Sequence, residues 1–123
     1  TTPIMTLFPY TTLFRSKLVR KEMKRKELLD NIKLILPLLN QYNDGTIHVQ
    51  ISFLQGLECA LENGDSLPTI REIKDILYPP RGGLSDFFVW KNDYLERLKI
   101  NEEIEAYNNR LWELLNQIEN LES

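Results

Sequence analysis

The sequence predicts an all-α fold: a single domain of four or five packed helices, with a Pro/Gly-rich loop before the C-terminal helix. Two observations lead to this prediction. Apolar residues recur at spacings of three and four in several stretches of the chain, which is the pattern of amphipathic helices. Clusters of Asn, Asp, Gly and Pro separate these stretches, as expected for turns between helices.

The first helix is expected over residues 24–41. Its apolar positions are Leu28, Leu29, Ile32, Ile35, Leu36 and Leu39. Pro37 lies inside this pattern, where a proline removes a backbone donor and clashes with the preceding turn, so we expect a kink or a split into two segments. The residues at 43–45, Asn-Asp-Gly, then predict a turn.

Two further helices are expected before the loop. Thr46 is the predicted cap of a helix that continues to about Glu62 and ends at Asn-Gly-Asp over 63–65. Ser66 or Thr69 is expected to cap a shorter third helix. That helix should stop before Pro79 and Pro80, because residues that precede proline avoid the helical region.

The last helix is expected to begin at Asn101, its predicted cap, with Glu102 and Glu103 favouring the positive end of the helix dipole. Its apolar face comprises Ile104, Tyr107, Leu111, Leu114, Leu115, Ile118 and Leu121. Residues 78–100 are therefore assigned to the loop.

The amino-terminal stretch from Thr6 to Ser16 is similar to the translation of a widely used short-read sequencing adapter. This likeness implies that residues 1–16 are an artefact and carry no functional weight. Met23 is then the expected natural start. Residues 17–22 would be untranslated leader, and residues 23–123 the single helical domain.

Composition narrows the class of protein. Residues 1–22 hold four of the 15 basic and one of the 18 acidic residues, so residues 23–123 carry 11 against 17, a formal net charge of −6. This acidic balance argues against nucleic acid as a partner, because phosphate contacts need clustered Lys and Arg. The chain has no apolar run near the length of about 20 residues that a membrane span requires, so we expect a cytoplasmic protein.

The single cysteine, Cys59, excludes internal disulfides and cysteine-based zinc sites, and we expect it to be buried. Catalysis is not expected either. His48 is the only histidine, the sequence has no nucleophile-elbow spacing, and Gly82-Gly83 lacks the Lys-Ser/Thr of a phosphate loop. The prediction is a protein without enzymatic activity, cofactor, catalytic residues or bound metal.

One block stands out by its glycines and aromatic residues. It reads Tyr78-Pro79-Pro80-Arg81-Gly82-Gly83-Leu84-Ser85-Asp86-Phe87-Phe88-Val89-Trp90-Lys91-Asn92-Asp93. The adjacent glycines suggest backbone geometry that a side chain would forbid. Ser85 or Asp86 could cap a helical turn, and Arg81 could bond to Asp86 or Asp93. The aromatic residues are expected to divide between core and surface.

This block resembles small bacterial helical domains of unknown function, of the immunity-protein type found near toxins. The matching positions are Arg81, Gly82, Gly83, Ser85, Asp86 and Trp90. Together with Asp93, these residues are the expected partner-binding site. The alternative is that the block is a tight helix junction, with the glycines forming the bend and the aromatic residues filling the core.

The leading functional hypothesis is a bacterial protein-interaction domain of the immunity type, which would bind and neutralise a protein toxin. Its acidic charge would steer it towards a basic nuclease surface. The first alternative is a self-associating structural protein, with a homodimer seam along Ile104 to Leu121. The second is a small hydrolase or ligand-binding enzyme, which would require a pocket around His48 or Asp86.

Overall fold

The computed structural model describes residues 9–122, and side chains from residue 16 onward. Within that range the chain forms four α-helices and one short 3₁₀ turn, and no strand. The helices are α2 (Pro9–Gln41), α3 (His48–Asn63), α4 (Ile70–Leu77) and α5 (Tyr94–Glu122), and the 3₁₀ turn η1 (Leu84–Asp86) lies between the last two. The predicted all-α class is confirmed.

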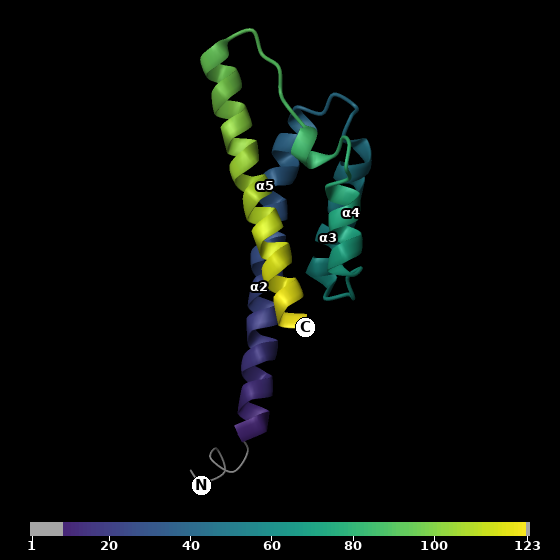
Figure 1. Ribbon diagram of the computed structural model, residues 1–123, viewed down its shortest axis with the longest axis vertical. Coiled ribbons are helices and arrows are strands. Elements are labelled where there is room, and N and C mark those ends of the chain that lie inside the picture. The colour runs from purple at the N-terminus through teal and green to yellow at the C-terminus, as the bar shows by residue number, and fades with distance from the viewer. Residues whose placement is uncertain (1–8, 123) are drawn as a thin grey trace.

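The two long helices form the backbone of the molecule. α2 and α5 lie side by side and run in opposite directions, while α3 and α4 pack together on one side of this pair (Figure 1). The segment between α4 and α5 passes over one end of the bundle and places the start of α5 there (Figure 1). At the opposite end, α2 continues beyond the last residues of α5.

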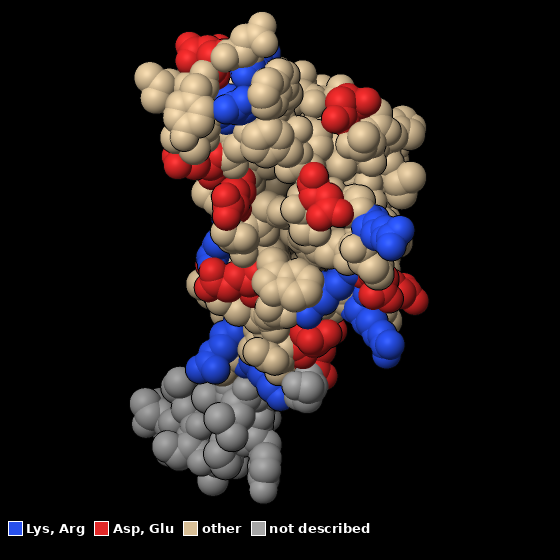
Figure 2. All heavy atoms as spheres, turned by 45° about the horizontal axis from the view of Figure 1, so that its top comes forward, with Lys and Arg blue, Asp and Glu red and all other residues tan. Residues whose placement is uncertain are grey.

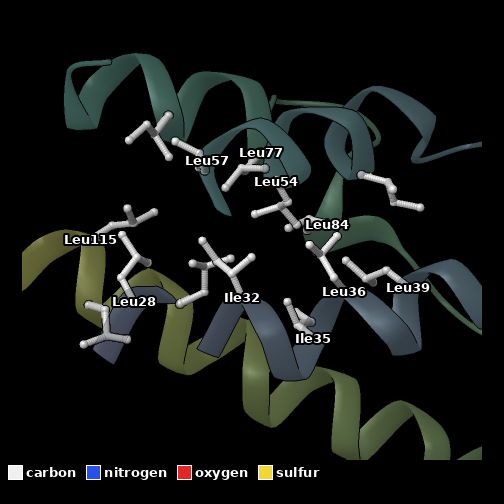
Figure 3. Packing of buried hydrophobic residues seen from close by; sticks show 14 of the residues in the cluster. Leu28, Ile32, Ile35, Leu36, Leu39, Leu54, Leu57, Leu77, Leu84 and Leu115 are labelled. Atoms are coloured by element: carbon white, nitrogen blue, oxygen red, sulfur yellow. The ribbon is translucent and has the colours of Figure 1, made fainter. Parts of the chain in front are cut away.

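A single hydrophobic core joins all the helices. The spacing of three and four residues on α2 places five side chains on one face, and all five are buried: Leu28, Ile32, Ile35, Leu36 and Leu39. Leu54 and Leu57 from α3, Leu77 from α4 and Leu115 from α5 meet them (Figure 3). Burying each such side chain stabilises the fold by roughly 1.5–3 kcal/mol.

Two buried polar side chains fix how the helices lie against one another. Asn31 on α2 donates to the Tyr107 carbonyl of α5 at 3.0 Å. Gln50 on α3 donates to the Ile76 carbonyl of α4, also at 3.0 Å. Because each amide has a partner, its burial does not carry the full cost of desolvation.

The first helix is longer than the expected span of 24–41, since it already begins at Pro9. Pro37 does not split it: α2 continues through this position to Gln41. The part of the adapter-like stretch at residues 6–8 lies outside the described residues.

The ends of α3 correct one prediction and confirm another. Thr46 does not cap the helix. Its hydroxyl donates to Asp44 Oδ1 at 2.6 Å, and the N-cap position falls at Ile47, whose side chain makes no cap bond. At the other end Gly64, in the left-handed conformation with φ of 72°, closes the helix as predicted for the Asn-Gly-Asp turn.

α4 follows the sequence prediction. Thr69 caps it by accepting from the Glu72 backbone N–H at 3.2 Å, and the helix stops at Leu77, ahead of Pro79. By contrast, Cys59 is exposed, contrary to the prediction of burial, because it lies outside the buried face of α3, which comprises Gln50, Ile51, Leu54 and Leu57.

The start of α5 is the largest correction. The helix begins at Tyr94, seven residues before the predicted cap at Asn101. Asp93 is the residue that caps it, since its Oδ1 accepts from the backbone N–H groups of Leu95 at 3.0 Å and Glu96 at 3.4 Å.

None of the helices in the described part of the chain is long and apolar enough to cross a membrane.

Candidate functional site

The segment between α4 and α5 is anchored at its first residue. The Tyr78 hydroxyl donates to Asn108 Oδ1 at 2.6 Å, and the ring packs edge-on against Trp112 with centroids 5.1 Å apart. Burial raises the pKa of the Tyr78 phenol above its ordinary value of about 10, because the ionised form would lose its hydration. Tyr78 therefore ties the end of α4 to the middle of α5.

The adjacent glycines form a turn that only glycine accommodates well. Gly82 and Gly83 have φ angles of 74° and 75°. A Cβ on Gly83 would lie 2.8 Å from the Leu77 carbonyl oxygen and would overlap the ring of Pro79. The prediction that the glycines serve a special backbone geometry is confirmed.

Asp86 stabilises this turn from within. Its Oδ2 accepts from the Gly82 N–H at 2.7 Å. Ser85 and Asp86 lie inside η1 and do not cap it, because the N-cap position is Gly83. The predicted pairing of Arg81 with Asp86 or Asp93 is also absent: among the described side chains Arg81 forms no ion pair, and both carboxylates accept from backbone N–H groups.

The chain after η1 is clamped to α5 by Asn101. The side-chain amide of Asn101 accepts from the Val89 N–H and donates to the Val89 carbonyl, both at 2.8 Å. Val89 is buried, whereas Phe88 and Trp90 on either side of it are exposed. The clamp thus presents two aromatic side chains outward from a fixed backbone.

These two aromatic residues belong to a larger exposed apolar surface. We define the apolar surface as Phe88, Trp90, Tyr94, Leu95 and Leu98. Trp90 is 69% exposed and Leu95 is 73% exposed, which are large fractions for side chains of this type. As predicted, the aromatic block divides between core and surface, because Phe87 packs against the hydrophobic core.

Arg97 lies between the aromatic rings of this surface. Its guanidinium carbon is 4.3 Å from the centroid of Trp90 and 5.3 Å from that of Tyr94. A hollow of about 400 Å³ opens here, lined by Phe88, Trp90, Tyr94, Arg97, Leu98 and Asn101. Stacking on a cation restrains the Trp90 ring, so less conformational freedom is lost when a partner binds.

A second hollow adjoins the first and shares Phe88, Leu98 and Asn101 with it. We call it the acidic groove; its volume is about 480 Å³, and it lies between residues 84–88 and α5. Its apolar part includes Leu84, Phe87 and Ile104. Glu102 and Glu105 line it from α5, three residues apart and therefore on the same side of the helix.

The charge around both hollows is negative. Residues 84–109 contain six Asp or Glu and three Lys or Arg. Two of the three cations are already engaged with rings, Arg97 as described and Lys91 over Tyr42 at 5.5 Å. Figure 2 brings this end of the molecule toward the viewer and shows uncharged atoms with both acidic and basic side chains beside them.

The predicted site residues fall into three groups. Gly82, Gly83, Asp86 and Asp93 shape the turn and the start of α5. Trp90 contributes to the apolar surface and Ser85 lines the acidic groove, while Arg81 is exposed and lines neither hollow.

Because the sequence prediction places residues 94–100 in the loop, it misses four residues in or beside the apolar surface: Tyr94, Leu95, Arg97 and Leu98. A pattern in the sequence could have found them. Asp93 and Glu96 have the spacing of a capping box, which marks a helix start.

The residues around which a catalytic pocket was considered, His48 and Asp86, lie apart from both hollows. His48 is exposed at the first turn of α3. No three His, Cys, Asp or Glu side chains in the described range gather where they could hold a metal ion.

The stripe proposed as a homodimer seam is largely buried within the bundle, including Leu111, Leu114 and Leu115.

Comparisons with known protein families, with curated protein sequences and with solved structures find no match to this chain. The fold and the surface define an all-helical protein with an exposed aromatic face.

Proposed function

We propose that this chain is a cytoplasmic bacterial protein-interaction domain of the immunity type, which binds a protein toxin through the apolar surface. The observation that carries the proposal is the exposure of Phe88, Trp90, Tyr94, Leu95 and Leu98 on one end of the bundle. Contiguous exposed apolar side chains bordered by polar residues are typical of protein-binding sites.

The composition of the surface favours a protein partner. Trp, Tyr and Arg are enriched among the residues that dominate binding energy at interfaces, and here Arg97 lies against Trp90 and Tyr94. The clamp of Asn101 on Val89 fixes the backbone that carries Trp90. A surface that is ordered before binding loses less entropy when the partner arrives.

The immunity assignment rests on charge. The chain has a formal net charge of −3, and the acidic side chains beside the apolar surface would attract a basic enzyme. The substrates of toxic nucleases are polyanions, so such enzymes carry basic surfaces. An acidic binding domain could therefore associate with one rapidly and cover the surface that contacts its substrate.

The test is capture from a bacterial lysate with the full chain and two matched variants. Trp90→Ala/Leu95→Ala removes two side chains of the apolar surface, and Leu34→Ala/Val49→Ala removes two exposed apolar side chains elsewhere. The proposal predicts a partner that the first variant loses and the second retains. Capture by all three proteins alike would contradict the proposed surface.

The captured partner then tests the immunity assignment. Its expression alone should arrest bacterial growth, and coexpression of the unaltered chain should relieve the arrest. The Trp90→Ala/Leu95→Ala variant should not relieve it. A partner that does not affect growth would leave an interaction domain without an immunity role.

A further inference from the structure

We infer that the acidic groove binds a basic amphipathic helix of a protein partner, whose apolar side chains enter the groove while its Lys or Arg side chains meet Glu102 and Glu105. This inference rests on the proposed function and names the chemistry of the partner. Its first basis is the shape of the groove. The α5 wall is formed by Leu98, Glu102, Glu105 and Asn109, which lie along one side of the helix at spacings of four, three and four.

This row spans about 16.5 Å, because an α-helix rises 1.5 Å per residue and Asn109 lies 11 residues after Leu98. The facing wall is formed by four residues of the short segment 84–88, namely Leu84, Ser85, Phe87 and Phe88. A partner helix of about three turns matches this length. Its side chains at spacings of three and four can then enter the groove, as in other helix-in-groove interactions.

The second basis is the state of the polar groups along the groove. Asn101 is committed to Val89, and Asn108 is committed to Tyr78 and the Leu84 carbonyl. Glu102 and Glu105, in contrast, form no ion pair with any described side chain. The two carboxylates are therefore available to a ligand.

The third basis is charge complementarity. Both carboxylates border apolar side chains, among them Phe88 and Leu98, which the groove shares with the apolar surface. A cation that approaches there loses part of its hydration and gains attraction in a less polar surrounding. An acidic or uncharged helix would leave both carboxylates desolvated and unpaired, which disfavours it.

The experiment measures binding of a synthetic helical peptide to the full chain by fluorescence anisotropy. The probe is an 18-residue labelled peptide of Leu and Lys with the leucines at spacings of three and four, and its counterpart carries Glu in place of every Lys. Glu102→Gln/Glu105→Gln is the test variant. Glu96→Gln/Glu103→Gln is its control, because it removes the same charge from α5 at two exposed positions outside the groove.

The Leu/Lys peptide should bind the unaltered chain and the Leu/Glu peptide should not. The test variant should weaken binding about tenfold or more, whereas the control should change it less than about threefold, since Glu96 and Glu103 line neither hollow and exposed charges that make no direct contact contribute little. Equal weakening by both variants, or equal binding of both peptides, would overturn the inference. Sedimentation gives a further contradicting result. If the unaltered chain and the control variant form a dimer and the test variant does not, a second copy of the chain occupies the groove, and the inference is overturned.

The inference and the proposed function can fail separately. A lysate partner that is lost with Trp90→Ala/Leu95→Ala but binds Glu102→Gln/Glu105→Gln as tightly as the unaltered chain would preserve the interaction domain and overturn the groove. Peptide binding at the groove, together with a lysate partner insensitive to Trp90→Ala/Leu95→Ala, would instead overturn the proposed surface.

Discussion

The side chain of Asn101 pairs with both polar groups of the Val89 backbone, accepting from its N–H and donating to its carbonyl at 2.8 Å each. The same amide also donates to the Arg97 carbonyl at 2.9 Å. One residue inside α5 therefore fixes the extended segment that carries Phe88 and Trp90.

Replacing this amide should destabilise the fold. Asn101→Ala leaves the buried Val89 N–H and carbonyl without their partner, and we expect the free energy of unfolding to fall by about 1–3 kcal/mol in urea. Asn109→Ala is the control, because it makes the same change on an exposed part of α5 and should alter stability by less than about 0.5 kcal/mol. Equal stability of the two variants would show that the clamp contributes nothing.

The two glycines of the turn should respond differently to alanine. Gly82→Ala meets open space but keeps a positive φ, so we expect a loss of about 1 kcal/mol in thermal or urea unfolding. Gly83→Ala should cost more, about 3 kcal/mol, because its Cβ also meets the Leu77 carbonyl and the Pro79 ring. The opposite order of the two losses would contradict this geometry of the turn.

Tyr78 should make stability depend on pH in the alkaline range. The folded state raises the pKa of this phenol, whereas the unfolded chain ionises it at a pH of about 10. Below that pH both states hold the proton. Above it the unfolded state alone gains the ionised form, so the free energy of unfolding falls by up to about 1.4 kcal/mol per pH unit.

The comparison with Tyr78→Phe isolates this effect. At pH 8 the variant should be less stable by about 1–2 kcal/mol, because Asn108 Oδ1 loses its donor. At pH 11 the difference in the free energy of unfolding between the unaltered chain and Tyr78→Phe should be smaller than at pH 8. If urea unfolding gives the same difference in the free energy of unfolding at pH 8 and at pH 11, Tyr78 ionises equally in the folded and the unfolded state.

Removal of residues 1–22 should leave the domain folded. Among the side chains that the structure describes, from residue 16 onward, the first buried apolar one is Leu28, so every described core side chain remains after truncation. Among the described side chains, truncation breaks the exposed ion pair of Lys21 with Glu122, and such a pair contributes about 0–1 kcal/mol. We expect the free energy of unfolding of residues 23–123, measured in urea, to lie within about 1 kcal/mol of that of the full chain. A much larger loss would show that the start of α2 is integral to the fold.

The fold class could be predicted because its cause is local and periodic. The spacing of Leu28, Ile32 and Ile35 specifies a buried helical face without reference to any other part of the chain. Thr69 was recognisable as a cap for the same reason, since its partner is three residues away. The helix start at Asp93 also has a local pattern, the capping-box spacing of Asp93 and Glu96. The sequence alone does not choose between this start and Asn101, which is also a residue type that caps helices.

The candidate surface was harder to predict because long-range contacts decide it. Asn101 has the residue type of a helix cap, yet its partner is Val89, 12 residues earlier. Leu95 and Leu98 have helical spacing like that of core residues, and only the packed structure shows that they face solvent. The prediction that Cys59 is buried is wrong because an apolar stretch of sequence does not reveal which side of its helix is covered.

The most direct measurement is a calorimetric titration of the captured partner into the unaltered chain and into Trp90→Ala/Leu95→Ala, with urea unfolding of both proteins. Trp90 and Leu95 are exposed, so the variant should keep its free energy of unfolding within about 0.5 kcal/mol. The dissociation constant should rise by about 100-fold, as expected when the centre of an interface is removed. An unchanged dissociation constant in a variant of unchanged stability would contradict the assignment of the apolar surface as the binding site.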